Sequence, residues 1–221
     1  MKWLWVLGVG MVLAAASACG GGGDKAAPSL SDADLKGIVT ITSEGLPWRV
    51  WPETDTAASN EQASQAFADP NTWLANYEKW GRTGGHAAAS AGAGVAVQAQ
   101  AESYTSIGGA KEAFSAVREF MTSGEALLTY ARAGYTDAKI DVIDAASVGD
   151  DSSAYRLTAS SNGTQFETLV IIFRRGAVLA QVSVGAAPDT TDPADVETLA
   201  NQMDGRIQNI LSEQPLSSQG N

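Results

Sequence analysis

Hydrophobic residues change their period along the chain, and these changes predict alternating strands and helices. Between residues 94 and 102, apolar residues alternate with Gln98, Gln100 and Glu102, which predicts a half-buried strand with a polar outer face. Residues 82–91 precede it as a weaker strand. From residue 106 to residue 122 the period becomes three to four, which predicts an amphipathic helix. The apolar face of this helix consists of Ala110, Ala113, Phe114, Val117 and Met121.

Four more strand-like segments follow between residues 139 and 185, joined by turn residues. Asn162-Gly163 separates two of them and is a strong signal for a tight hairpin. One segment contains the letters TLVIIF, which are apolar on both faces and predict a central strand covered on both sides. An antiparallel meander is therefore predicted from the segments 140–143, 154–159, 166–173 and 178–184.

The last helix has the clearest boundaries. Asp192 is placed to cap it, Pro193 suits its first position, and Pro215 ends it before the tail 215–221, which we expect to be disordered. Gly205 costs such a helix about 1 kcal/mol relative to alanine, which suggests a close contact there. The apolar stripe comprises Val196, Leu199, Ala200, Met203, Ile207, Ile210 and Leu211.

The region before these elements is less regular. A short helical turn is expected to begin at Ser31 or Asp32 and to stop at Gly37, with residues 38–41 extended beyond it. The letters LPWRVWP contain two prolines and exclude regular helix. Residues 56–68 are rich in alanine and glutamine and are predicted to be helical.

The order of these elements predicts an α+β fold, with an antiparallel sheet of about five to six strands and helices packed on its faces. Residues 31–214 are enough for one domain with a sizeable core.

The first 18 residues have the order of charge and hydrophobicity of an export signal. Lys2 precedes an apolar run that ends in Ala16-Ser17-Ala18, and no acidic residue occurs before Asp24. The run is shorter than the roughly 20 residues that cross the hydrocarbon of a bilayer. Residues 1–18 are therefore predicted to be a signal peptide.

Cys19, the only cysteine, follows the predicted signal. Ordinary signal peptidase recognises such an A-x-A pattern, and Ala16-Ser17-Ala18-Cys19 also resembles the lipobox of bacterial lipoproteins, with Ala16 in place of the usual leucine. An unpaired thiol would be reactive in an oxidising compartment, and lipidation removes it. We therefore predict a lipid anchor, palmitate included, on Cys19, which holds the protein at the extracytoplasmic face of the cell membrane. Residues 19–30 would form a Gly-rich tether.

The net charge of the whole chain is −11, and Lys2 is the only charged residue of the signal, so the mature chain carries −12. Such a chain is repelled by phosphate backbones, which excludes nucleic acid as an expected partner.

The ionisable residues predict no catalytic or metal centre, and no cofactor is expected. His86 is the only histidine, and no nucleophile motif accompanies it, so a strand or loop residue is the simpler interpretation. One histidine and one cysteine do not form a zinc site. Asp189, Asp192 and Asp195 lack the spacing of an EF-hand loop.

Aromatic residues are the strongest binding signal. Trp73, Tyr77 and Trp80 recur at i, i+4 and i+7 and share one face of a short helix that ends at Gly81. They either seal one end of the sheet or form a site for a small apolar or sugar-like ligand or for an envelope protein. The candidate binding residues are Trp48, Trp51, Trp73, Tyr77, Trp80 and Arg82.

Five segments resemble small exported lipoproteins of unknown or sensor-like role, namely DLKGIVTITSEGLP, WGR, SIGGAKEAFSAV, VIIFRRGAVLAQVSV and DVETLANQMDGRI. Their arrangement is similar to the PsbP-like α/β/α fold of LpqN-type mycobacterial lipoproteins. The resemblance carries packing and turn residues only, so it transfers no catalytic or ligand residue. The chain departs from the disulfide-containing sensor domains of bacterial Ser/Thr kinases, because a single cysteine forms no internal disulfide.

What the resemblance implies is a non-enzymatic binding, sensor or accessory role in the cell envelope. The alternatives are an envelope hydrolase that uses His86 and a purely structural interaction module.

Overall fold

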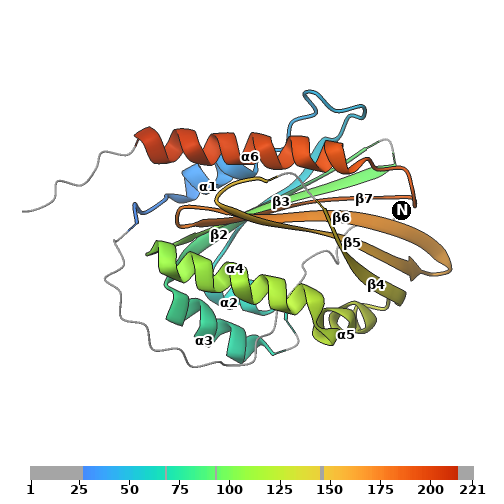
Figure 1. Cartoon of the computed structure of the whole chain (residues 1–221), viewed down its shortest axis with the longest axis horizontal. Coiled ribbons are helices and arrows are strands. Elements are labelled where there is room, and N and C mark those ends of the chain that lie inside the picture. Colours follow the sequence, from blue (N-terminus) through green and yellow to red (C-terminus); the bar gives the residue numbers. More distant parts are fainter. Residues whose placement is uncertain (1–26, 68, 93, 145–146, 214–221) are drawn as a thin grey trace, which may run out of the picture.

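The computed structural model describes residues 27–67, 69–92, 94–144 and 147–213. Within these residues a seven-stranded antiparallel sheet lies between two layers of helices (Figure 1). The strand order is β1-β2-β3-β7-β6-β5-β4. This arrangement confirms the α+β fold, with seven strands where five to six were predicted. The signal peptide, Cys19, most of the tether and the C-terminal tail lie outside the described residues.

The strands are β1 (Trp51–Ala58), β2 (Arg82–Gly92), β3 (Val95–Tyr104), β4 (Thr136–Ile143), β5 (Asp151–Ser161), β6 (Thr164–Arg175) and β7 (Val178–Ala186). The helices are α1 (Asp32–Val39), α2 (Asn60–Ser64), α3 (Pro70–Trp80), α4 (Ile107–Thr122), α5 (Gly124–Arg132) and α6 (Pro193–Glu213).

The strand that sequence analysis missed is β1, at one edge of the sheet. It pairs with β2 over its whole length, so the prediction of helix from residue 56 is wrong for residues 56–58. An edge strand tolerates Pro52, because only one of its sides must supply ladder hydrogen bonds. Helix α2 begins only at Asn60, with Ser59 as its N-cap. Pairing with β2 outweighs the local helical preference of the segment.

Helix α1 begins as predicted but ends later. Ser31 caps it, and the helix continues through Gly37 to Val39, so the prediction that residues 38 and 39 are extended is wrong. Ile38 and Val39 are buried in the core between the sheet, α1 and α6. Their burial outweighs the local cost of glycine in a helix.

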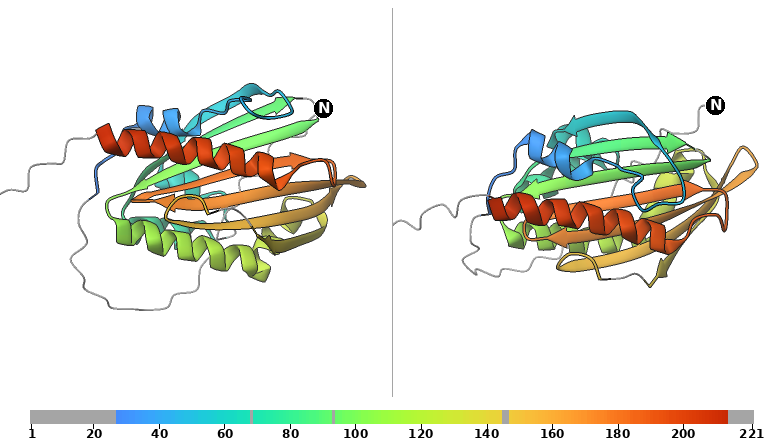
Figure 2. Two further views of the ribbon diagram at one scale, coloured as in Figure 1. Left: turned by 45° about the horizontal axis from the view of Figure 1, so that its top comes forward. Right: turned by 90° about the horizontal axis from the view of Figure 1, so that it is seen from above.

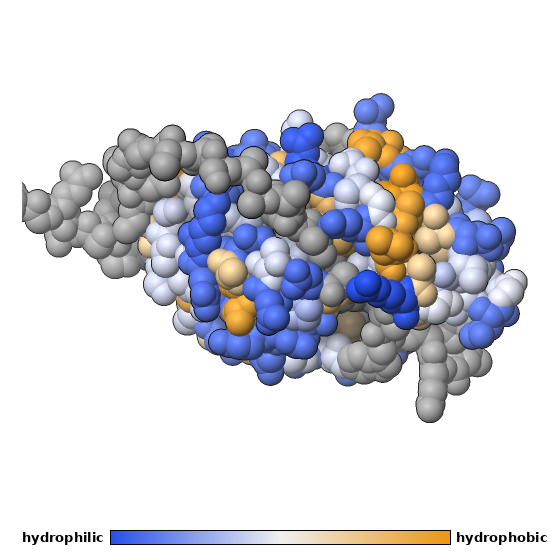
Figure 3. Space-filling view, turned by 90° about the horizontal axis from the view of Figure 1, so that it is seen from below, coloured by the Kyte–Doolittle hydropathy of each residue, from blue (hydrophilic) through white to orange (hydrophobic). Residues whose placement is uncertain are grey.

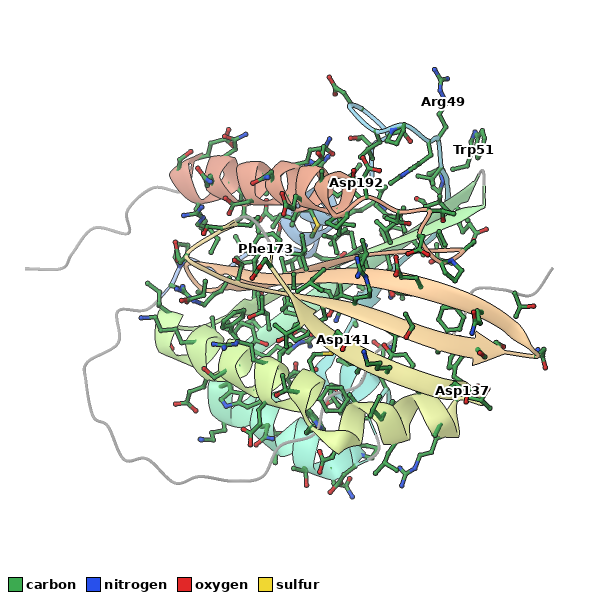
Figure 4. All side chains as sticks on the ribbon, turned by 45° about the vertical axis from the view of Figure 1, so that its right-hand side comes forward. Arg49, Trp51, Asp137, Asp141, Phe173 and Asp192 are labelled. Atoms are coloured by element: carbon green, nitrogen blue, oxygen red, sulfur yellow. The ribbon has the colours of Figure 1, made fainter. Side chains whose placement is uncertain are left out.

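Each face of the sheet carries its own hydrophobic core. Helices α1 and α6 cover one face, and α2, α3, α4 and α5 cover the other (Figures 1 and 2). Phe173 points from β6 toward α6 (Figure 4). Because β6 supplies fully buried side chains to both cores, the prediction that it is a central strand is confirmed.

The predicted meander and last helix are also confirmed. Strands β4 to β7 pair in chain order, and Asn162 and Gly163 form the β5–β6 turn with φ of 50° and 76°. The Asp192 carboxylate accepts a hydrogen bond from the Ala194 N–H at 2.9 Å at the start of α6. A Cβ atom on Gly205 would meet nothing within 4 Å, so the expected close contact at Gly205 is wrong.

Candidate functional site

A cavity of about 120 Å³ lies between the sheet and helices α2, α3 and α4. Its apolar wall includes Phe67, Trp73, Tyr77 and Trp80 on one side and Ala113, Val117, Ile172 and Leu179 on the others. The sheet adds a polar floor of Gln100 and Glu102 from β3 and Gln181 from β7. The site is therefore apolar around its sides and polar at one surface, as ligand pockets commonly are.

Helix α3 positions the aromatic wall. Asp69 caps it through the Thr72 N–H at 3.2 Å, and Pro70 occupies its first turn. The spacing of Trp73, Tyr77 and Trp80 then turns all three toward the sheet, where they are buried. Phe67 stacks on Trp73 with ring centroids 3.9 Å apart. These ring contacts hold the aromatic wall in place.

Strand β3 positions the polar floor. Its alternation places Gln100, Glu102 and Tyr104 on the same face, below α3 and α4. Glu102 is only 6% exposed. Its carboxylate accepts hydrogen bonds from the Tyr104 hydroxyl at 2.7 Å and from the Gln100 amide at 3.3 Å. A buried carboxylate is thereby held in one orientation.

Arg82, the first residue of β2, balances the charge of Glu102. Its Nε lies 3.1 Å from the Glu102 Oε1, and its guanidinium lies 4.8 Å from the centre of the Tyr77 ring. The same group donates to the Asn60 Oδ1 at 2.7 Å and to the Ala58 carbonyl at 3.3 Å. Burial is the largest single influence and lowers the pKa of Arg82, but the charge and hydrogen bond of Glu102, together with Tyr77 and Tyr104, outweigh it and raise the pKa.

The two tyrosines beside this pair stay neutral. Burial raises the pKa of Tyr77 and of Tyr104 well above the ordinary value, and the charge of Glu102 acts in the same direction. Tyr104 therefore remains a hydrogen-bond donor to Glu102 throughout the physiological range of pH.

One polar group of the aromatic wall lacks a partner. The Trp73 side chain is 1% exposed, and its indole N–H meets no acceptor among the described residues. Trp73 lines the cavity, and a buried donor without an acceptor is costly.

The structure brings together only part of the predicted candidate set. Trp73, Tyr77 and Trp80 line the cavity, and Arg82 pairs with the floor through Glu102. Trp48 instead packs against the core on the opposite face of the sheet. Trp51 is 61% exposed on β1 (Figure 4).

Gln100, Glu102 and Gln181 of the cavity floor were not predicted from the sequence to be site residues. The alternation of β3 predicts a polar outer face, but helices α2, α3 and α4 cover the end of that face. The only signal was a glutamate among small apolar residues with an arginine twenty positions before it, and pairing of β2 with β3 is needed to bring the two together.

His86 lies on the other face of the sheet from the cavity floor. Its Nδ1 is 3.0 Å from the Asp32 Oδ1 of α1, and its Nε2 contacts the Asp55 Oδ1 of β1. Lys36 of α1 also pairs with Asp55. Both ring nitrogens of His86 are therefore occupied by carboxylates, and the cluster joins α1 to the sheet.

The surface over α3, α4 and α5 is mostly hydrophilic, and its apolar parts form small areas (Figure 3). Among the described residues, the large apolar side chains that are exposed are Trp51, Ile107, Leu128 and Val142. None of the described helices combines the length and hydrophobicity that a membrane span requires.

The fold and the cavity define an α+β protein with a small, partly polar pocket on one face of its sheet. In comparisons with known proteins, no protein-family model and no curated protein matched the chain. The solved structures that the chain matches include the extracellular domain of PknH from Mycobacterium tuberculosis, at 12% identity and a TM-score of 0.48; the match covers 87% of this chain and 100% of that chain.

Two further structures are similar at a lower level. The Rv0999 ortholog from Mycobacterium smegmatis, a putative uncharacterized protein, has 12% identity and a TM-score of 0.43, covering 80% of this chain and 94% of its own. A protein of unknown function from Pseudomonas aeruginosa, PA94, has 15% identity and a TM-score of 0.25, covering 58% and 78%.

Proposed function

We propose that this protein is an extracytoplasmic lipoprotein, anchored through Cys19, that binds a small ligand in the cavity between α3, α4 and the sheet. The observation that carries the binding role is the ordered polar floor of Gln100, Glu102 and Gln181 beneath an apolar wall. The signal-like residues 1–18 and the resemblance to LpqN-type lipoproteins support the location.

Binding is favoured over hydrolysis by the position of His86. A general base needs a ring nitrogen directed at the nucleophile. Both nitrogens of His86 contact carboxylates, and the residue lies on the opposite face of the sheet from the cavity floor. The polar floor of the cavity, on the face away from His86, therefore supports binding more than hydrolysis.

The binding role is tested by filling the cavity. Ala113 is fully buried on α4 and lines the cavity, so Ala113→Leu should occupy its space. In a thermal-shift screen of small apolar compounds, alcohols, sugars and peptides, the unchanged protein should be stabilised by one class, and the variant should lose that shift. Glu119→Gln, on the exposed side of α4, is the control.

A circular dichroism spectrum like that of the unchanged protein shows that Ala113→Leu has folded. No shift with any class, or the same shift in both proteins, would contradict the proposal and favour an interaction module.

A further inference from the structure

We infer that the cavity binds a small uncharged alcohol or phenol, free or as the end group of a larger molecule. This inference rests on the proposed function and narrows it to one class of ligand. It is carried by the size of the cavity, its apolar wall, the unpartnered indole N–H of Trp73 and the acceptors of the floor.

The size of the cavity limits the ligand. Its volume of about 120 Å³ is close to that of an engineered apolar cavity of about 150 Å³ that binds benzene. A single six-membered ring or a short alkyl chain fits this space. Gln62 of α2 and Ala66, just after this helix, are exposed and form part of the lining, so a larger molecule has a way to insert one end.

The walls disfavour a sugar. A hexose carries hydroxyl groups around its whole ring, and several of them would face Val117, Ile172 and Leu179. These side chains offer no hydrogen bond, and burial of each unpaired hydroxyl is costly. A ligand with one polar end and one apolar end matches the cavity better.

The polar groups of the cavity require the polar end of the ligand both to donate and to accept a hydrogen bond. The Glu102 carboxylate only accepts hydrogen bonds, whereas the Trp73 N–H only donates them. Among the described residues that line the cavity, Trp73 has a buried N–H without a hydrogen-bond partner, and Glu102 lies in the floor of the same cavity. A hydroxyl group donates and accepts at once, so one hydroxyl satisfies both requirements.

The ligand should also be uncharged. An anion would meet the buried carboxylate of Glu102, and a cation would compete with Arg82, whose Nε already lies 3.1 Å from that carboxylate. The balanced pair leaves no net charge at the floor for an ion to neutralise.

The experiment compares phenol, toluene and glucose as probes of the full mature chain, by titration followed in two-dimensional NMR. Phenol and toluene have rings of the same size, so the hydroxyl is the difference between them. We expect phenol to bind about tenfold more tightly than toluene, which corresponds to a difference of about 1.4 kcal/mol in binding free energy. Glucose should not bind.

The variant Trp73→Phe keeps an aromatic ring in the wall and removes the N–H. Because that N–H has no partner in the free protein, its removal should not lower stability through a lost hydrogen bond. Phenol affinity should fall about fivefold, and toluene affinity should stay within twofold. Trp48→Phe, which changes a tryptophan on the opposite face of the sheet, is the matched control and should bind both probes normally.

The outcomes separate the inference from the proposed function. Equal binding of phenol and toluene, or an equal loss of both in Trp73→Phe, overturns the alcohol inference and leaves a ligand cavity. Binding of glucose without phenol overturns it in favour of a sugar site. Binding of none of the three probes overturns the inference, and the proposed function then depends on the wider thermal-shift screen.

Discussion

Arg82 and Glu102 form a buried ion pair, with side chains that are almost inaccessible to solvent and a separation of 3.1 Å between Nε and Oε1. Desolvation costs a buried pair much of its Coulombic attraction, so its net contribution is small while both partners are present. Removing one partner is different, because the other charge is left without compensation. Substitution of either partner alone is therefore expected to lower the stability of the protein.

Arg82→Met should lower the free energy of unfolding by about 3–5 kcal/mol, because it leaves the Glu102 carboxylate buried and unpaired. Chemical denaturation measures the change. Lys139→Met is the control, since Lys139 pairs with Asp141 at the surface, and should cost less than about 1 kcal/mol. If Arg82→Met lowers the free energy of unfolding no more than the control does, the Arg82–Glu102 pair does not behave as a buried ion pair.

At the scale of elements, helix α1 is joined to the sheet by a charged cluster as well as by its apolar face. Lys36 and His86 both contact Asp55 of β1, and Asp32 contacts the other side of the His86 ring. The hydrogen bond from Lys36 and then that from His86 hold the pKa of Asp55 below its ordinary value. The attachment of α1 therefore depends on an ionised Asp55.

Asp55→Asn should make stability less dependent on pH in acid. Because the pKa of Asp55 is lower in the folded chain than in the unfolded chain, its contribution is present above the ordinary carboxyl pKa of about 3.9 and is lost as pH falls through the folded value. The free energy of unfolding should fall less steeply between about pH 5 and pH 2 in the variant. Lys36→Met, which removes the main cause, should flatten the same range, and an unchanged slope in both variants would refute this role.

Two helical glycines with opposite surroundings give a second prediction for the elements. A Cβ atom on Gly109, near the start of α4, would lie 1.9 Å from the Trp80 carbonyl oxygen, whereas one on Gly205 of α6 would meet nothing within 4 Å. Gly109→Ala should therefore separate α4 from the end of α3 and lower stability by more than about 1 kcal/mol. Gly205→Ala should raise it by about 0.5–1 kcal/mol. Thermal unfolding of both variants measures the difference, and the same sign of change in both would contradict the packing described.

At the scale of the whole molecule, the helices divide into two layers with different tasks. The α1 and α6 layer closes one core, and the α2–α5 layer closes the other and leaves the cavity. With a net charge of −11, the chain is repelled by anionic lipid headgroups. Attachment to a membrane would then depend on the lipid.

The proposed lipid anchor on Cys19 is tested by mass spectrometry of the protein as the cell exports it. We expect a diacylglyceryl group on Cys19 and no residues before it, because Ala16-Ser17-Ala18-Cys19 resembles a lipobox, in which the cysteine is lipidated and becomes the first residue. The variant Cys19→Ser should be absent from the membrane fraction. An unmodified thiol at Cys19 in the mature protein would count against the anchor.

The sequence predicted those elements whose signals are local. Helix α6 and the β5–β6 hairpin follow from caps, turn residues and periodicity within a few positions. The missed elements depend on distant partners. Strand β1 forms because β2 supplies hydrogen bonds to it, and α1 continues past Gly37 because Ile38 and Val39 are buried against α6 and the sheet.

The candidate site shows the same division. Periodicity alone placed Trp73, Tyr77 and Trp80 on one face of a helix, since i, i+4 and i+7 spacing fixes their direction. Only the tertiary structure decided that this face meets Glu102 and Gln100 across a cavity and that Trp48 lies elsewhere. The physical reason is that a repeat specifies which side chains share a face, whereas strand pairing and helix packing between distant segments determine what that face contacts.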